Sequence, residues 1–85
     1  FNRVIEEEVC YTLLVQEIDR LPEQCRKVFK LVLEGKSNPE IAQDLNVSIE
    51  TVKSHKQTGK KILHERLQHV ISTNILLFML KTMNL

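Results

Sequence analysis

Residues 37–61, SNPEIAQDLNVSIETVKSHKQTGKK, constrain the fold of this chain more than any other stretch. A serine followed three residues later by a glutamate, as at Ser37 and Glu40, is typical of a capping box that starts a helix. Asn46 tolerates the left-handed backbone conformation with which a helix ends sharply. Ser48 is a favourable N-cap for a second helix. The stretch therefore predicts two helices joined by a tight polar turn.

The second of these helices has an apolar side and a basic, polar side. At 100° per residue, its apolar positions form one stripe, which consists of Ile49, Val52, Leu63, Leu67 and Val70. Opposite lie Glu50, Ser54, Gln57 and Lys61, with Lys53 and Thr58 on the flanks. A small residue at Ala42, a turn residue at Asn46 and a β-branched residue at Val52 have the spacing of a helix-turn-helix motif.

The rest of the chain predicts an all-α fold of four to five helices around this motif, without a wing. The 85 residues include only two glycines and two prolines, and no run alternates between apolar and polar residues as a strand would. Apolar residues recur at helical spacing over 4–21, and Pro22 suits the start of the next helix. Gly35 suits its end. We expect one domain over 1–71 and an apolar helical tail over 72–85.

The charged residues are distributed unevenly. Residues 1–50 contain ten acidic and six basic residues, a net charge of −4, whereas residues 51–85 contain one acidic and six basic residues, a net charge of +5. Four lysines and no acid lie between Thr51 and Lys61. Such a polarised domain presents a basic surface to a polyanion, although four lysines on one helix could equally form an ordinary solvated face. The caps and the motif spacing favour DNA.

A helix fits the major groove, and the side chains on its polar side are of the types that bind DNA. The residues expected to face base edges are Lys53, Ser54, Gln57 and Lys61. Those expected to bind phosphates are Ser48, Thr51, Lys56 and Lys60, with Thr58 on the flank of the same surface. Two positions are irregular. Lys56 lies within the apolar stripe, so either its stem packs while its ammonium group reaches outward, or the helix is exposed there. Gly59 weakens a helix. Gly59 suggests that another backbone comes close.

Other chemistries have little support. Cys10 and Cys25 are expected to be small buried residues rather than a disulfide or metal ligands. His55, His64 and His69 have the wrong spacing for metal ligands on one helical face. No nucleophile with a partnered base and no glycine-rich phosphate loop is present, so we expect neither an enzyme nor a cofactor.

The C-terminal tail ends in ILLFMLKTMNL, residues 75–85, with Lys81 as its single charged residue. Ser72, Thr73 and Asn74 could end the preceding helix or cap the next. We expect the tail to fold back on the domain, pair with a second copy in a dimer, or meet a partner. Its apolar run over 75–80 is too short to cross a membrane. The chain begins at Phe1 without a methionine, so we expect it to be a piece of a longer polypeptide.

Residues 18–63 resemble region four, the C-terminal domain of bacterial RNA polymerase sigma factors of the extracytoplasmic-function type. The resemblance rests on LP followed by RKVF, then GKSNPEIAQDL, then S-x-x-TVKSH. It implies that the last helix recognises the minus-35 promoter element, that the first helices dock on the β flap of RNA polymerase core, and that an anti-sigma factor covers these surfaces. It also implies a cytoplasmic protein. On this resemblance Lys53, Ser54 and Gln57 meet bases, and Thr51, Lys60 and Lys61 meet phosphates.

Two alternatives remain at this stage. GKSNPEIA and TVKSH also fit the DNA-binding domain of LuxR-type response regulators, although LPEQCRKVF and the long acidic first helix do not. The second alternative is a helical protein-interaction module, whose basic face binds an acidic partner and whose tail dimerises. That module would lose its activity if Leu77 and Leu80 became polar, and it would not bind DNA in a salt-sensitive way.

Overall fold

The computed structural model describes residues 3–71 and 73–82, and the side chains of residues 8–71, 75–78, 80 and 81. Within these ranges the protein is all-α, as predicted, and contains no strand. The helices are α1 (Arg3–Ile18), α2 (Glu23–Leu33), α3 (Asn38–Leu45), α4 (Ile49–Leu67) and α5 (Thr73–Thr82). The role predicted for Ser72, and the part of the tail beyond residue 82, lie outside the described residues.

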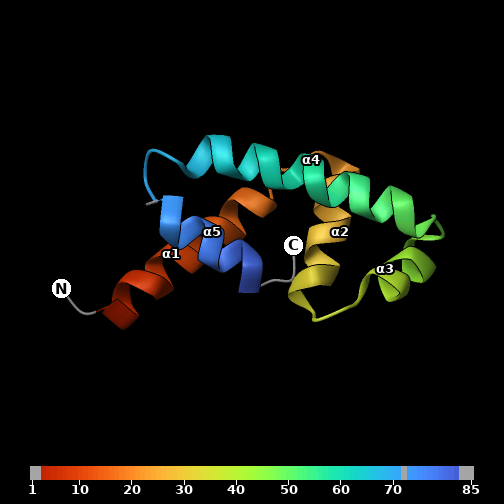
Figure 1. The fold of residues 1–85 in the computed structure, drawn as a ribbon, viewed down its shortest axis with the longest axis horizontal. Helices are drawn as coiled ribbons and strands as arrows, with labels where there is room; N and C mark the ends of the chain where they lie inside the picture. Colours follow the sequence, from red (N-terminus) through yellow and green to blue (C-terminus); the bar gives the residue numbers. More distant parts are fainter. Residues whose placement is uncertain (1–2, 72, 83–85) are drawn as a thin grey trace.

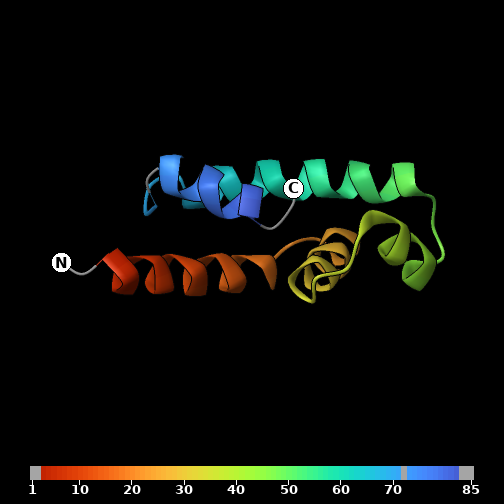
Figure 2. The same ribbon diagram turned by 60° about the horizontal axis from the view of Figure 1, so that its bottom comes forward.

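Helix α4 is the longest straight element and contacts each of the other four helices (Figure 1). The molecule is elongated, with dimensions of 44 × 21 × 18 Å. Figure 2 shows α1 antiparallel to α4 beneath its C-terminal half, and α2 and α3 beneath its N-terminal half. Helix α5 turns back and runs beside the C-terminal half of α4. One helix therefore connects the two ends of the molecule.

The core consists of two clusters of buried side chains. The helix-turn-helix cluster joins α2, α3 and the start of α4, and its buried members are Val28, Val32, Ile41, Ala42 and Val52. The second, which we call the α1–α5 cluster, contains Cys10, Leu14, Ile18, Leu21, Cys25, Phe29, Leu63, Leu67, Ile71, Leu76 and Leu80. Both cysteines are buried in this cluster, which confirms their predicted burial. Burial raises the pKa of the Cys25 thiol.

Gly59 of α4 lies against the ring of Phe29 from α2, a member of the α1–α5 cluster. A Cβ atom at this position would lie 3.0 Å from Cζ and 3.1 Å from Cδ2 of Phe29, and closer still to Cε2. The prediction that another backbone approaches Gly59 is therefore wrong, because the neighbour is an aromatic ring. Phe29 itself is fully buried.

The ends of the apolar stripe predicted for α4 differ from the prediction. Val52, Leu63 and Leu67 are buried as expected, but Ile49 is 39% exposed and Val70 is 66% exposed. Helix α4 ends at Leu67, so Val70 no longer follows the helical repeat. Ile49 is the first residue of the helix and extends past the helix-turn-helix cluster.

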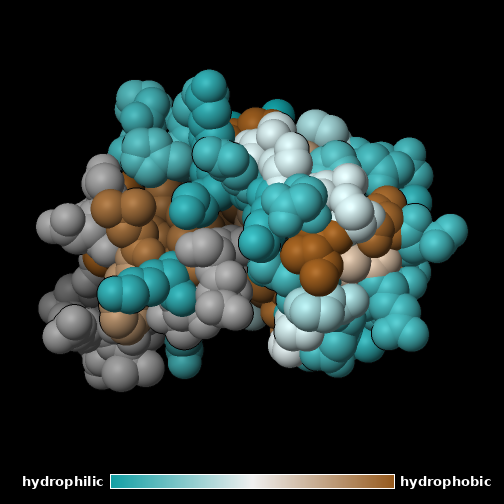
Figure 3. All heavy atoms as spheres, turned by 45° about the vertical axis from the view of Figure 1, so that its right-hand side comes forward, coloured by the Kyte–Doolittle hydropathy of each residue, from teal (hydrophilic) through white to brown (hydrophobic). Residues whose placement is uncertain are grey.

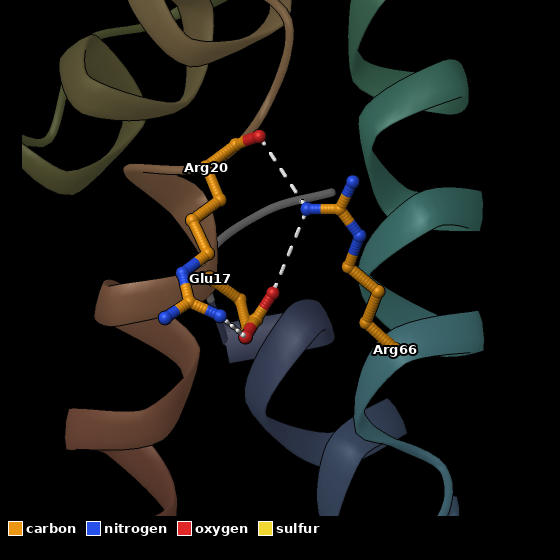
Figure 4. A network of polar contacts seen from close by, with 3 residues as sticks. All are labelled: Glu17, Arg20 and Arg66. Carbon is orange, nitrogen blue, oxygen red and sulfur yellow. Dashed lines mark hydrogen bonds and ion pairs between the residues drawn. The ribbon is translucent and has the colours of Figure 1, made fainter.

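A polar network joins the end of α1 to α4 (Figure 4). Nη1 of Arg66 donates to the carbonyl oxygen of Arg20 at 3.4 Å and lies 3.6 Å from Oε2 of Glu17. Nη1 of Arg20 donates to Oε1 of Glu17 at 3.4 Å. The side chain of Glu17 is only 18% exposed, so these contacts are less screened than ion pairs at the surface. They hold the C-terminal end of α1 against α4.

The apolar tail folds back on the domain, which was one of the three arrangements expected for it. Leu76 and Leu80 of α5 are buried in the α1–α5 cluster, beside residues of α1 and α4. Leu77 and Phe78, on the outer side of α5, are 52% and 66% exposed. The structure does not test whether a second copy or a partner also binds this helix, so dimerisation stays a prediction.

Candidate nucleic-acid interface

Local hydrogen bonds fix both ends of α3, and with them the turn that leads into α4. At the start of α3, the Ser37 N–H donates to Oε1 of Glu40 at 3.1 Å, and the Glu40 N–H donates to Ser37 Oγ at 3.4 Å, which completes the predicted capping box. The bonds from Ser37 hold the pKa of the Glu40 carboxyl below its ordinary value. At the other end, Asn46 is left-handed with φ of 56°, as predicted. The Val47 N–H donates to the Ala42 carbonyl oxygen at 3.0 Å.

Helix α4 begins with the predicted serine cap. Ser48 Oγ accepts a hydrogen bond from the Thr51 N–H at 3.1 Å, and the two hydroxyl oxygens lie 2.9 Å apart. Both hydroxyls therefore serve first to fix the start of the helix. They remain at its N-terminal end, where the dipole favours an anion such as a DNA phosphate.

The structure brings most of the predicted DNA-binding residues to one surface of α4, which we call the outward face. The exposed members are Ser48, Lys53, Ser54, Gln57, Thr58 and Lys61, and those of intermediate exposure are Thr51 and Lys60. All lie on the side away from the two core clusters, or on its flanks. Figure 3 shows that the end of the molecule built from α3 and the start of α4 is mostly hydrophilic, with small separate hydrophobic patches.

Lys53 is the most available cation near the start of the outward face. Its side chain is 58% exposed, and its Nζ lies 3.9 Å from Oε1 of Glu50, whose side chain is 85% exposed. A pair this long and this exposed contributes little to stability. Little energy is therefore lost when the Lys53 ammonium group leaves Glu50 for another partner.

Lys56 is the one predicted DNA-binding residue that the structure separates from the others. It is only 8% exposed and lies in the buried stripe of α4 between Val52 and Gly59. Burial lowers the pKa of its ammonium group. Its stem packs inside the domain, so the outward face does not include Lys56 in this conformation.

Replacing Lys56 by methionine is expected to stabilise the protein at pH 7 by about 1 kcal/mol, because methionine keeps the packing and removes a poorly solvated charge. The penalty is fully present below the lowered pKa of folded Lys56, and it disappears as the pH rises to the ordinary value of 10.5. The advantage of methionine should therefore shrink in alkaline solution. Urea unfolding from pH 7 to 10.5 measures both effects.

Lys27→Met is the matched control for Lys56→Met, since the side chain of Lys27 is 47% exposed. It should change the free energy of unfolding by less than about 0.5 kcal/mol. A Lys56→Met protein less stable than the wild type at pH 7 would mean that the ammonium group makes a stabilising contact.

A groove lies between the outward face and α5. Its volume is about 670 Å³, and it is lined by Ser54, Gln57, Thr58, Lys60, Lys61, His64, Glu65, Leu77 and Leu80. Five of these were predicted to bind DNA. The sequence did not indicate that His64, Leu77 and Leu80 lie beside them. The apolar character of the tail predicted that one side of it would be buried, but not against which helix.

The described residues form neither a metal cluster nor a membrane-spanning helix. Residues 3–71 and 73–82 contain no group of three or more His, Cys, Asp or Glu residues that could hold a metal ion. In the same part of the chain, no helix combines the length and the apolar character needed to cross a membrane.

Comparison with known proteins identifies the family. The family described as Sigma-70, region 4 matches residues 11–63, which is more than half of the chain. The match begins in α1 and ends in α4, so it includes the whole helix-turn-helix and leaves out α5. No curated protein and no solved structure matches the sequence. On the extent of this match, the chain belongs to the Sigma-70 region 4 family.

Proposed function

We propose that this domain binds promoter DNA through the outward face of α4 and thereby directs RNA polymerase to a minus-35 element. The observation that carries the proposal is the exposure of Lys53, Ser54 and Gln57 on a helix whose start is fixed by a capped turn. Membership of the Sigma-70 region 4 family supports it. Lysine can donate to guanine O6 and N7, and glutamine can bond adenine, so these side chains suit base recognition.

The phosphate contacts in this proposal come from both ends of the outward face. Thr51 and Ser48 lie at the helix start, while Lys60 and Lys61 lie about one turn beyond Gln57. Phosphate contacts position a protein on DNA without reading its sequence. They also make the affinity depend on salt, because each neutralised phosphate releases counterions.

Lys53→Ala and Gln57→Ala are each expected to weaken binding to a preferred duplex by about 1–3 kcal/mol, or roughly 5- to 150-fold, because each removes a base contact. The effect on random duplexes should be much smaller. Fluorescence anisotropy over a salt series measures both, with duplexes first selected from a library that contains minus-35-like sequences.

Lys27→Ala and Gln24→Ala are the matched controls, since they make the same changes at exposed positions of α2. Both should bind like the wild type. If Lys53→Ala and Gln57→Ala weaken random and preferred duplexes equally, these residues bind phosphates rather than bases. If the wild type binds no duplex even at low salt, DNA binding by the isolated domain is refuted.

We also propose the extracytoplasmic-function subtype, docking on the polymerase β flap, control by an anti-sigma factor and a cytoplasmic location. These rest on the resemblance of residues 18–63, with LP, RKVF and TVKSH as its most specific parts. A pull-down of the chain with the isolated β flap tests the docking. Failure to bind the flap, together with salt-sensitive DNA binding, would favour the LuxR-type alternative.

The interaction-module alternative needs a different test from the one that the sequence suggested. Leu80 is only 2% exposed and belongs to the α1–α5 cluster, so a polar residue there would disturb folding as well as any partner. Leu77 is 52% exposed and can be changed with less effect on the core. A partner that binds the wild type but not Leu77→Ser, while DNA binding is absent, would support the interaction module.

A further inference from the structure

Helix α5 forms one wall of the groove whose floor is the outward face of α4. Leu77 and Leu80 line this groove together with Gln57 and Lys61. Figure 2 shows that α5 lies along the C-terminal half of α4 and leaves the N-terminal half uncovered. The start of the proposed DNA surface, with Lys53, is therefore open, whereas its continuation lies beside a second helix.

Two helices side by side are too wide for the groove that one helix fills. A helix with its side chains is about 10–12 Å across, and packed helices have axes about 8–10 Å apart, so a pair measures roughly 18–22 Å. The major groove is about 12 Å wide. With α5 in place, α4 can enter the groove along its N-terminal half, but α5 meets the DNA backbone beside the C-terminal half.

The side of α5 that would meet the backbone is mostly apolar, and its one exposed cation among the described residues, Lys81, lies in the last turn of the helix. Leu77 is 52% exposed and Phe78 is 66% exposed, and neither can neutralise a phosphate. On α4, Lys60 and Lys61 line the same groove and have the charge that phosphates require. The apolar helix therefore lies beside two cations that the proposed DNA contact uses.

Helix α5 can leave without removing the core of the helix-turn-helix. The buried members of the helix-turn-helix cluster come from α2, α3 and the start of α4, and none comes from α5. The family match also ends at residue 63, before α5 begins at Thr73. Displacement of α5 would uncover only the α1–α5 cluster, from which Leu76 and Leu80 would withdraw.

We propose that α5 is an autoinhibitory cover, which restricts DNA to the N-terminal half of α4 until it is displaced. This inference rests on the proposed DNA binding. In the covered state Lys53 and Ser54 reach the duplex, and Lys60 and Lys61 do not reach phosphates. Displacement of α5 adds these contacts, so it raises both the affinity and its dependence on salt.

The test holds α5 in place with a cross-link. His64→Cys and Leu77→Cys are combined, because both positions line the groove and neither belongs to the proposed DNA-binding set. A bifunctional maleimide with a short flexible spacer joins the two thiols. The matched control is the same double variant treated with N-ethylmaleimide, which modifies both thiols without joining them. The wild type treated with the bifunctional reagent controls for the buried Cys10 and Cys25.

The cross-linked protein is expected to bind a preferred duplex about tenfold or more weakly than the N-ethylmaleimide control, with a salt slope smaller by about two. A second variant, Leu77→Ser, weakens the contact of α5 with the groove at a half-exposed position without adding charge, and it should bind more tightly than the wild type. Circular dichroism confirms that its helices remain. Equal affinities and slopes for the cross-linked and control proteins would overturn the inference. Absence of binding by every protein, wild type included, would instead remove the proposed function and this inference with it.

Discussion

Phe29→Ala is expected to lower the free energy of unfolding by about 3–5 kcal/mol, since it empties a fully buried position in the α1–α5 cluster. A chain of 85 residues has a total stability of about 4–13 kcal/mol, so the variant should be partly or wholly unfolded at 37 °C. The ring packs against Gly59 of α4, which leaves no neighbouring side chain there to fill the cavity. Urea unfolding followed by circular dichroism measures the loss.

Tyr11→Ala provides the control for Phe29→Ala, because it also replaces an aromatic residue by alanine, but at a position that is 49% exposed. It should cost less than about 1 kcal/mol. If the two variants lost similar stability, the packing of Phe29 between α2 and α4 would not be a main source of stability.

Gly59→Leu is expected to destabilise the protein by about 2 kcal/mol. A side chain at this position runs into the ring of Phe29, and overpacking a core costs about 1–3 kcal/mol. We expect the upper end of that range, because Phe29 is fully buried and has no free space into which to move. Leucine returns about 0.8 kcal/mol as the better helix former. Thermal unfolding should show a lower Tm.

Glu65→Leu introduces the same residue at an exposed position of α4, and it should change the Tm only slightly. A further check compares Gly59→Ala in the wild type and in a Phe29→Leu background. The loss of stability caused by Gly59→Ala should be smaller in the Phe29→Leu background, because the smaller side chain relieves part of the clash. A Gly59→Leu protein as stable as the wild type would mean that α2 and α4 separate easily, contrary to their packing here.

The local features of this fold were predictable from sequence, because they depend on neighbouring residues alone. The capping box of Ser37 and Glu40, the left-handed Asn46 and the Ser48 cap involve residues at most four positions apart. Gly35, which ends α2 with φ of 84°, is another example. The all-α class follows from the same signals.

Features that depend on distant segments were predicted less well. The helical repeat placed Val70 on the buried stripe, but periodicity does not show where a helix ends. Gly59 indicated a close approach, but not that Phe29, thirty positions earlier, supplies the neighbour. Both errors arise because tertiary packing selects among arrangements that the local sequence allows.

The candidate site shows the same division. Eight of the nine predicted DNA-binding residues are exposed or partly exposed on α4 or at its N-cap, because the 100° repeat determines which residues share a face. Lys56 is buried, although its type predicts a surface residue, since its stem is apolar enough to pack. The groove with α5 was not predictable, because an apolar helix carries no signal of which surface it will cover.

The shared helix α4 has a mechanical consequence. Its 19 residues form a rod about 28 Å long, with the helix-turn-helix cluster at one end and the α1–α5 cluster at the other. A rigid helix transmits a displacement along its length, so a ligand that shifts α4 at one cluster also shifts the residues of α4 packed in the other. Linkage then makes the effect reciprocal: DNA must alter the affinity for that ligand by the same factor by which the ligand alters the affinity for DNA.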